Sequence, residues 1–349
     1  MKRIWAGMGV AVMCVSAWVA PAKAVDRDPS SFVWLFSDTG YAAQGTGLAM
    51  SRGKAWPVVF GTSDTFTLRP TSGGTFGGFW SDVAAPLGFG PIRTASSSNG
   101  SVAGVNFFGN NNGGYIVGPT GTSTTLSSGI VAVDYTASGV LVTATENSVN
   151  GFVYDGQFGI QDIAVSPFGD GGVLRNGEFY STLTNDAISL TFATGTTYTG
   201  LGSLVFDAQG RPHVVDREGN AFSFETNAGG WSATSLGTVG NTNSRLPIAA
   251  DSTGTVGTAY VNNNSELIYA YWTASAGWQS TLVALNADQG FQIGLDFDYE
   301  DLPVISYVDL NSGNVVVAYD PIAVPEPSVA VVCGLMSGLL LRRRVASMN

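Results

Sequence analysis

Residues 204–234 read LVFDAQGRPHVVDREGNAFSFETNAGGWSAT, and residues 248–281 read IAADSTGTVGTAYVNNNSELIYAYWTASAGWQST. Both stretches begin with an apolar run that ends in Asp, followed by Gly three residues later, two more runs rich in apolar residues, and a Gly-Trp pair that opens a final run. Residues 295–319, LDFDYEDLPVISYVDLNSGNVVVAY, repeat the first three runs with Asp301 at the glycine position. The chain therefore contains an internal repeat.

The spacing of the repeat identifies its structural unit. Asp207, Asp251 and Asp298 are separated by 44 and 47 residues, and Trp231 and Trp278 by 47. Each unit has the pattern of four short β-strands, with a tight Asp-x-x-Gly turn between the first two. Four strands in about 45 residues are typical of one blade of a β-propeller. A pair of β-sandwiches or a right-handed β-helix would not predict this register.

Similar turns occur upstream with weaker flanking patterns. Counted by the glycine position, the turns fall at residues 53, 100, 139, 169, 210, 254 and 301. The sequence therefore predicts an all-β protein with a single propeller, with seven blades favoured. The short intervals of 39 and 30 residues in the middle leave six blades as the alternative. The units resemble those of bacterial propellers whose blades carry Asp-x-x-Gly-x-Pro-His, Tyr-Ala-x-Trp and Gly-Trp in this order.

The last unit lacks an obvious fourth strand, because the chain continues into a proline-rich segment after residue 319. A surplus β-prone segment, Ser31 to Phe36, precedes the first recognised blade and is followed by Thr39-Gly40. We predict that this segment pairs with the strand at residues 315–319, closes the ring and is largely buried.

The composition excludes several classes of protein. Of the 349 residues only 12% are charged and 46 are glycine, which is not typical of coiled coils or helical cytosolic enzymes. The net charge is −11, and residues 25–324 alone carry 9 Lys/Arg and 25 Asp/Glu, a formal charge of −16. A body this acidic repels phosphate backbones, so nucleic acid is not an expected partner.

The N-terminus has the pattern of a secretory signal. Met1 to Arg3 is basic, residues 4–19 are an apolar run, and Ala22 and Ala24 flank a lysine in a small-x-small cleavage site. We therefore expect residues 1–24 to be a signal peptide, residues 25–320 to be the propeller body, and residues 321–349 to be a separate tail.

The tail combines three parts in a fixed order. A proline-rich segment, residues 321–328, precedes thirteen mostly apolar residues, 329–341, and then Arg342, Arg343 and Arg344. Arginines at this position favour the cytoplasmic side of a membrane. Thirteen residues are fewer than the about 20 that span a bilayer core, so an interfacial helix is also compatible with hydropathy alone.

This order, with Val324, Pro325, Glu326 and Pro327 at the start, resembles the PEP-CTERM sorting signal of Gram-negative bacteria. The resemblance implies a short transmembrane helix, an inner-membrane intermediate, recognition of Pro-Glu-Pro by an exosortase, and release to the cell surface or matrix. It covers about 25 residues and predicts a destination rather than an activity. Similar tails are also labelled as C-terminal domains of ice-binding proteins, which says nothing about the body.

Both cysteines lie in the predicted terminal segments. Cys14 is in the signal peptide and Cys333 is in the tail, so the body has no cysteine. A disulfide framework, a thiol nucleophile and a thiolate metal site are therefore excluded for the body.

Few residues of the body suggest chemistry. Asp296, Asp298, Glu300 and Asp301 provide oxygen ligands suited to calcium, but they lack EF-hand spacing, and a solvated acidic turn is favoured. We therefore expect no metal, no cofactor and no catalytic residue. His213 is the only histidine, and it occupies a strand position of the repeat, which favours a structural role.

The aromatic residues divide into two groups. Trp80, Trp231 and Trp278 recur in the repeat, which favours packing within blades over a platform for sugars. A second group alternates along strands, so that some of its members could reach the mouth of the propeller. This group consists of Tyr269, Tyr271, Trp272 and Tyr307.

Two functional classes remain. The favoured one is a non-enzymatic exported protein whose propeller is a binding or structural module, with an extracellular polysaccharide or another envelope protein as its partner. The alternative is a secreted propeller glycosidase or polysaccharide lyase. Glycosidases need paired carboxylates in one pocket, and the 25 acidic residues of the body supply candidates without selecting any.

Overall fold

The computed structural model describes residues 32–43, 45–51, 56–61, 65–69, 79–84, 92–106, 114–118, 122–150, 159–184, 186–225, 230–240, 245–298 and 300–320. The predicted signal peptide with Ala22 and Ala24 lies outside these residues. So do the Val324–Pro327 motif and the arginines at 342–344. No helix in the described ranges has the length and apolar character needed to cross a bilayer.

The described residues form seven antiparallel sheets, and neighbouring strands within each sheet are almost always consecutive in the chain. The first three sheets comprise β2 (Thr46–Ser51), β3 (Trp56–Gly61), β4 (Thr65–Arg69) and β5 (Phe79–Ala84); β6 (Ile92–Ser96), β7 (Val102–Asn106), β8 (Gly114–Val117) and β9 (Ser123–Leu126); and β10 (Ile130–Tyr135), β11 (Leu141–Thr145) and β12 (Val149–Asn150).

The next two sheets comprise β13 (Ile160–Val165), β14 (Gly171–Arg175), β15 (Glu178–Ser181) and β16 (Asp186–Ser189); and β17 (Gly202–Phe206), β18 (Pro212–Asp216), β19 (Asn220–Glu225) and β20 (Gly230–Ser235). The last two comprise β21 (Ile248–Ala250), β22 (Val256–Val261), β23 (Leu267–Thr273) and β24 (Gly277–Ala284); and β25 (Gly294–Phe297), β26 (Pro303–Val308) and β27 (Asn314–Tyr319), joined by β1 (Leu35–Ala42).

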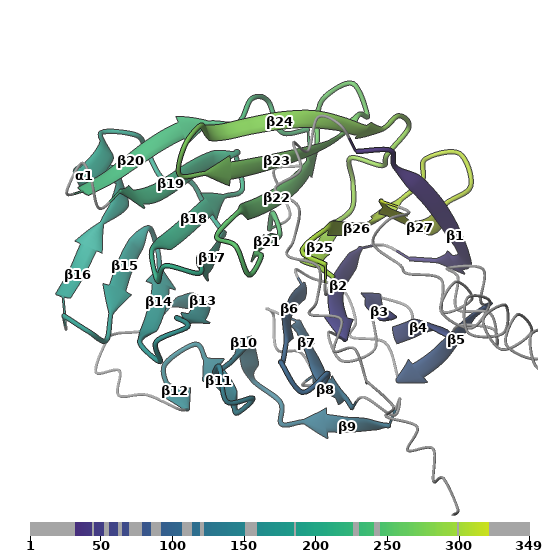
Figure 1. Ribbon diagram of the computed structural model, residues 1–349, viewed down its shortest axis with the longest axis horizontal. Helices are drawn as coiled ribbons and strands as arrows, with labels where there is room; N and C mark the ends of the chain where they lie inside the picture. The colour runs from purple at the N-terminus through teal and green to yellow at the C-terminus, as the bar shows by residue number, and fades with distance from the viewer. Residues whose placement is uncertain are drawn as a thin grey trace, which may run out of the picture.

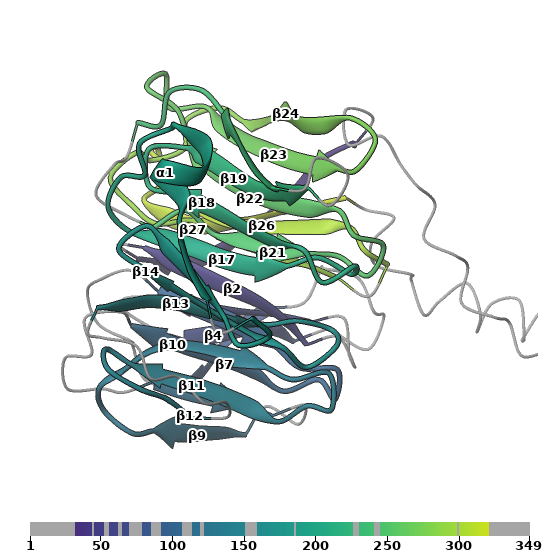
Figure 2. The same ribbon diagram turned by 90° about the vertical axis from the view of Figure 1, so that its left-hand side faces the viewer.

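The sheets are arranged radially around one axis, as Figure 1 shows. The innermost strands contact one another in the cycle β2, β6, β10, β13, β17, β21, β25 and back to β2. Seen from the side in Figure 2, the sheets stack against one another around the ring. The expected all-β propeller is therefore confirmed.

The burial of each strand follows from its place in a blade. The second strands β18, β22 and β26 bury every residue, because adjacent blades cover both of their faces. The outer strand β20 has no buried residue, and β24 buries only its last two. This pattern explains why the second strands read as continuous apolar runs.

The ring is closed by pairing the two ends of the body. β1 lies antiparallel to β27, with Leu35 opposite Tyr319 and Asp38 opposite Val316. The predicted pairing is thus confirmed, but two details of the prediction are wrong. The strand begins at Leu35 and continues through Gly40, with a register shift between Asp38 and Ala42.

The predicted burial of residues 31–36 is also wrong. Val33, Leu35 and Phe36 are 65%, 42% and 48% exposed, whereas Phe32 and Trp34 are partly buried against the core. The physical reason is that β1 is the outermost strand of its sheet, so one of its faces has no neighbouring strand layer to cover it.

The turn between the first and second strands recurs in six blades with the same hydrogen bonds. Residue i of each turn donates its N–H to the carbonyl four residues later, with N–O distances of 2.7 to 3.0 Å. Residue i is Ser97, Thr136, Ser166, Asp207, Asp251 or Asp298. Residue i+3 has a positive φ in every copy and is glycine in all but the last, where Asp301 has a φ of 63°. The left-handed conformation explains the recurrent glycine.

The only described helix is α1 (Leu190–Thr194), which directly follows β16. Ser189 accepts a hydrogen bond from the Phe192 N–H at its start, and Gly195 ends it in the left-handed conformation.

Candidate functional site at the propeller axis

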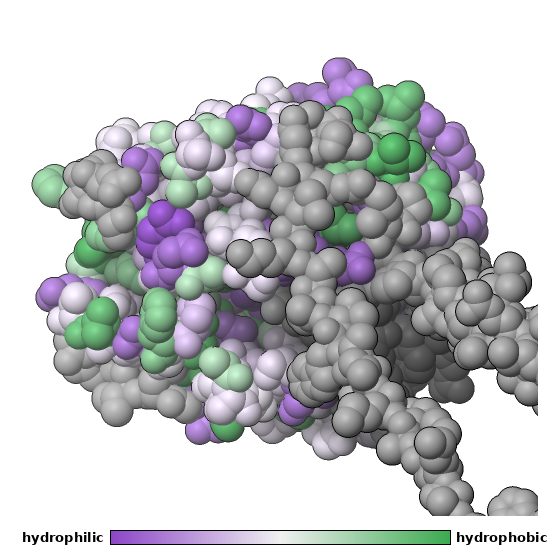
Figure 3. All heavy atoms as spheres, in the orientation of Figure 1, coloured by the Kyte–Doolittle hydropathy of each residue, from purple (hydrophilic) through white to green (hydrophobic). Residues whose placement is uncertain are grey.

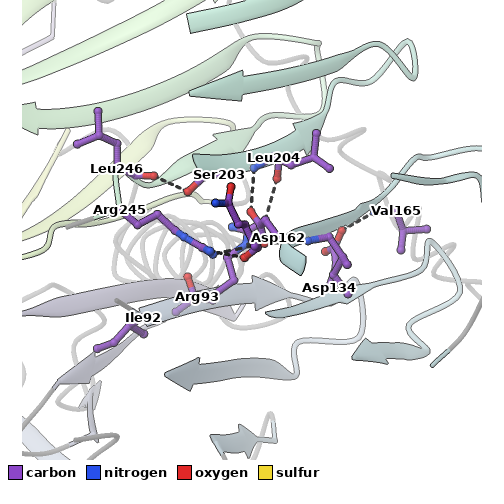
Figure 4. Close-up of polar contacts among 12 residues, drawn as sticks. Ile92, Arg93, Asp134, Asp162, Val165, Ser203, Leu204, Arg245 and Leu246 are labelled. Atoms are coloured by element: carbon purple, nitrogen blue, oxygen red, sulfur yellow. Dashed lines mark hydrogen bonds and ion pairs between the residues drawn. The ribbon is translucent and has the colours of Figure 1, made fainter. Parts of the chain in front are cut away.

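Three charged residues, two on inner strands and one just before an inner strand, meet near the axis, as Figure 4 shows. Arg93, on β6, donates from Nε to Asp162 Oδ1 on β13 at 2.8 Å, and from Nη2 to the Leu204 carbonyl on β17 at 3.0 Å. Arg245, just before β21, places Nη1 3.6 Å from the same Oδ1 atom and donates from Nη2 to the Gln161 carbonyl.

These groups are almost fully removed from solvent. The side chains of Asp162 and Arg245 are 0% and 1% exposed, and that of Arg93 is 11% exposed. Burial lowers the pKa of Arg245, and the carboxylate of Asp162 opposes this shift. Because a buried charge is costly unless it is paired, the Asp162 carboxylate stabilises both guanidinium groups, which repel one another, at the centre of the ring.

Aspartates on the inner strands also join neighbouring blades directly. Asp134 accepts the Val165 N–H on the next inner strand at 2.7 Å. Asp162 accepts the Leu204 N–H at 2.8 Å in the same way. Each carboxylate also accepts the N–H of the residue that follows it, at 2.8 and 3.0 Å. One side chain therefore fixes two backbone positions.

Asp296 repeats this arrangement at the closing blade. Its Oδ1 accepts the Phe297 N–H at 2.8 Å, and its Oδ2 accepts the Met50 N–H on β2 at 2.7 Å. Ser96, on β6, donates its hydroxyl to the same Oδ2. The carboxylate therefore links the last inner strand to the first, and hydrogen bonds to a charged acceptor contribute about 1.5–3 kcal/mol each.

The local environment sets the protonation of Asp134. Burial raises the pKa of this carboxyl to about 6, whereas the charge of Arg93 and the N–H groups of Val165 and Tyr135 oppose the rise. The Asp134 carboxyl therefore gains a proton under mildly acidic conditions.

A small polar hollow adjoins the two arginines. Its lining includes Arg93, Thr94, Ser203, Arg245 and Gln292. The side chain of Gln292 bridges to β6, accepting the Ile92 N–H and donating to the Ile92 carbonyl at 2.6 Å each. The space admits a water-sized molecule. It is too small for a sugar ring.

The solvated acidic turn expected at Asp296, Asp298, Glu300 and Asp301 is wrong for two of these residues, because Asp296 and Asp298 are buried. Asp296 bonds to the neighbouring inner strand β2, Asp298 bonds within its own turn, and Asp301 accepts from Ser252 of the preceding blade. No cluster of three His, Cys, Asp or Glu side chains suited to a metal ion occurs in the part of the chain that the structure describes.

His213 is enclosed within its blade. Its side chain is 0% exposed, with Nε2 3.3 Å from Asp207 Oδ2 and Nδ1 2.9 Å from Ser223 Oγ. Its ring also lies 4.6 Å from that of Trp272. Burial lowers the pKa of His213, which favours the neutral ring. Although Asp, His and Ser are in contact here, the imidazole is buried in the blade.

The aromatic repeat residues pack between blades. Trp231, on β20, lies 5.3 Å from Phe179 of the preceding blade between ring centroids, and Trp278 donates from Nε1 to Ser223 of the preceding blade at 3.2 Å. The side chain of Trp80 lies outside the described part of the chain. These contacts agree with the packing role expected for the repeat.

The second aromatic group does not reach a funnel mouth. All four of its members are 4% exposed or less, because neighbouring blades cover the strands that carry them. These residues are Tyr269, Tyr271, Trp272 and Tyr307. The expectation that some could line an opening is therefore wrong.

The axial cluster itself was missed from the sequence. Asp134 and Asp162 lie two and four residues before the first residue of the repeated turn. Isolated charges at such positions in apolar first strands are the signal that could have identified an axial network. Their partners in other blades are tens of residues away and have no local signature.

Comparison with known proteins establishes the fold class. No family model and no curated protein matches the sequence. Among solved structures, virginiamycin B lyase from Staphylococcus aureus superposes with a TM-score of 0.55 and 10% identity, covering 82% of this chain and 99% of that one. The structure of YCF48 bound to D1 peptide gives a TM-score of 0.51 and 13% identity, covering 85% of this chain and 97% of that one.

A third similar structure is the extracellular domain of a one-component system from B. thetaiotaomicron, with a TM-score of 0.53 and 12% identity. The match covers 83% of this chain and 45% of that one. At these identities the likeness is one of fold. The chain is a β-propeller, a class that includes both enzymes and binding proteins.

Proposed function

We propose that this protein is exported and acts as a non-enzymatic binding or structural module at the cell surface or in the extracellular matrix. The observation that carries the proposal is the use of the buried charged groups at the axis. Asp134, Asp162 and Asp296 each hold two blades together, and the only histidine is enclosed in its blade. These side chains form their hydrogen bonds with other parts of the propeller.

The destination in this proposal rests on the two ends of the sequence. Residues 1–24 have the order of a signal peptide, and Val324 to Pro327 precede an apolar run and three arginines. A sorting enzyme of the exosortase type then acts at the Pro-Glu-Pro triplet, after the tail has held the protein at the inner membrane of a Gram-negative bacterium.

The proposed ligand is an extracellular polysaccharide of low charge. A formal charge of −16 over residues 25–324 disfavours strongly anionic polymers. A propeller of similar fold is known in complex with a peptide, which supports binding as a use of this scaffold.

The test is to apply the full chain to an array of extracellular polysaccharides while measuring the release of reducing sugar and of unsaturated lyase products. We expect retention without turnover. Turnover would contradict the proposal and favour the alternative, a secreted propeller glycosidase or polysaccharide lyase; a lyase occurs among the similar structures. Retention of no polysaccharide would contradict the assigned ligand class.

The sorting step has a separate test. Replacing Pro325, Glu326 and Pro327 with alanine should leave export intact and stop removal of the tail. Surface delivery of fully processed triple-alanine protein would contradict the exosortase assignment and leave the tail as a simple anchor.

A further inference from the structure

The start of the body exposes apolar side chains in an alternating pattern. Phe32 and Trp34 pack against the core cluster that contains Tyr269, and the Trp34 and Tyr269 rings are 6.1 Å apart. Val33 and Leu35, which alternate with them, are 65% and 42% exposed. Because neighbouring residues of an extended chain point in opposite directions, the segment covers the core with one face and presents an apolar face to solvent.

The end of β24 extends this exposed surface. Val283 and Ala284 belong to the same core cluster that Phe32 and Trp34 cover. Leu282 and Leu285, on either side of them, are 48% and 58% exposed. Figure 3 shows apolar side chains gathered over the end of β24 and the start of β1. We define the β1–β24 patch by Val33, Leu35, Leu282 and Leu285.

The tail leaves the body beside this patch. Tyr319 is the cross-strand partner of Leu35, and the described chain ends one residue later, at Asp320. The eight residues 321–328 can span up to about 26 Å. The run that follows, residues 329–341, would measure about 20 Å as a helix. An apolar segment is therefore tethered within reach of an exposed apolar surface.

The other end of the chain offers a weaker occupant. Its apolar run, residues 4–19, belongs to the predicted signal peptide. Removal of residues 1–24 would leave Val25 to Ser31, which include Asp26, Arg27 and Asp28 and supply little apolar surface. The C-terminal run is the segment that remains available to an exported, unprocessed chain.

We propose that the β1–β24 patch binds the apolar run at residues 329–341 of the same chain whenever that run is not in a membrane. The tether raises the effective concentration of the run to the millimolar range, so modest burial of apolar surface is sufficient. The contact shields the tail in water and is released when the bilayer competes for it. The proposal rests on the tail sequence and does not require the sorting reaction proposed above.

The native cysteines allow a direct test, because each lies in one apolar terminal run and the body has none. Leu285→Cys is introduced together with Cys14→Ser, and the dilute full chain is oxidised with diamide in buffer without detergent. We expect an intramolecular disulfide between position 285 and Cys333, identified by peptide mass. Leu285 is more than half exposed, so the substitution should not disturb folding.

The matched control is Leu183→Cys with Cys14→Ser. Leu183 is 72% exposed and follows β15, in a blade remote from β1 around the ring. The disulfide at position 285 should form at least about tenfold faster than at position 183. Equal rates would overturn the proposal. An intermolecular disulfide would identify a second copy as the occupant and would also overturn it.

A third variant distinguishes the two ends of the chain. Leu285→Cys with Cys333→Ser retains only Cys14 as the native partner. We expect little disulfide in this variant, and a fast intramolecular disulfide with Cys14 would assign the patch to the N-terminal run instead. Neither result bears on cleavage at Pro-Glu-Pro, which the triple-alanine variant tests separately.

Discussion

The turns that begin at Asp207 and at Asp298 have the same backbone hydrogen bonds and different electrostatic surroundings. Asp207 Oδ1 accepts the N–H groups of Gln209 and Arg211, both at 2.9 Å. Asp298 Oδ1 accepts the N–H groups of the residues at the same two offsets, at 2.8 and 2.9 Å. In both blades one carboxylate oxygen stabilises the turn.

The second carboxylate oxygen has different partners in the two turns. Asp207 Oδ2 accepts from Arg211 Nε at 2.6 Å and lies 3.3 Å from His213 Nε2. Asp298 Oδ2 is buried and has no hydrogen-bond partner within the described part of the chain. The positions that correspond to Arg211 and His213 are Leu302 and Val304, whose side chains carry no hydrogen-bond donor.

The pKa values differ accordingly. Burial raises the pKa of Asp207, but the hydrogen bonds from His213 and Arg211 outweigh burial and leave it below the ordinary value. Burial raises the pKa of Asp298 to about 7, and the nearby carboxylates of Glu300 and Asp301 add to the rise. The repeat therefore determines the conformation of the turn, whereas side chains of the following strand determine the charge state of the aspartate that begins it.

The largest expected effect comes from removing the paired carboxylate. Asp207→Ala leaves Arg211 and His213 without their partner inside the blade, and we expect the free energy of unfolding to fall by about 3–5 kcal/mol at pH 7. Denaturant unfolding measures it. Thr136→Ala, at the same turn position in another blade, removes a neutral cap and should cost about 1 kcal/mol. Equal losses in the two variants would contradict the role of the ion pair.

The second-largest expected effect is a gain in stability on replacing Asp298. The folded-state pKa of Asp298 is about 7, against about 3.9 when unfolded, so the folded protein retains a proton that the unfolded chain releases between these values. The stability contribution is present below pH 4 and is lost as pH rises through 7. Asp298→Asn cannot ionise, so we expect it to be about 2–4 kcal/mol more stabilising at pH 8 than at pH 4.

Unfolding of Asp298→Asn and of the parent chain at several pH values between 4 and 8 tests this. A constant difference across the range would show that Asp298 does not change its proton binding on folding. Asp288→Asn, at a partly exposed position with its own turn hydrogen bond, is the matched control for replacing a turn carboxylate with an amide.

The repeat predicted the architecture because it reports local geometry. The glycines at 100, 139, 169, 210 and 254 all occupy the left-handed turn position, and a positive φ is a requirement that sequence displays directly. The pairing of β1 with β27 followed from counting strands in the last unit. Both inferences depended on short-range patterns and on the need to pair each strand.

The axial network could not be predicted in the same way. Arg93 and Asp162 are 69 residues apart and meet only because ring closure brings β6 and β13 to the same axis. The exposure of Val33 and Leu35 depended on their position at the outer edge of a blade, which apolar character does not reveal. Contacts between blades depend on where each blade lies around the ring, and the repeat pattern does not contain this information.

A smaller loss of stability is expected when Arg211 is replaced by leucine, the residue at the corresponding position of the Asp298 turn. Arg211→Leu removes the Nε donor and the contact of the guanidinium with the Trp272 ring, whose centroid is 4.7 Å from Cζ. We expect the pKa of Asp207 to rise and the free energy of unfolding at pH 7 to fall by about 1.5–3 kcal/mol.

The sign of the pH dependence checks the cause. A lowered folded-state pKa contributes stability above the unfolded pKa, and this stability is lost as pH falls through the folded-state value. Arg211→Leu should therefore be less damaging at acidic pH, where Asp207 is protonated, than at pH 7. Arg211→Lys keeps the charge without the planar fork and should lie between the two proteins. A loss independent of pH would indicate packing alone.

The smallest effect is expected where the last turn departs from the repeat. Asp301 takes the position held by glycine in the other described turns, with a φ of 63° that costs an L residue about 1–2 kcal/mol. Part of this cost is offset by hydrogen bonds from the Ser252 N–H and hydroxyl of the preceding blade, which are exposed to solvent. Asp301→Gly should therefore raise the free energy of unfolding by about 0.5–1 kcal/mol.

The same substitution removes a negative charge beside Asp298, so the pKa of Asp298 should fall and the loss of stability toward pH 7 should become shallower. Asn286→Gly is the matched control, because Asn286 has a φ of 61° and carries no charge. Both variants should gain from the backbone, and only Asp301→Gly should change the pH dependence. If Asp301→Gly loses stability while Asn286→Gly gains it, the bridge from Ser252 to Asp301 holds the two blades together more strongly than the left-handed backbone strains them.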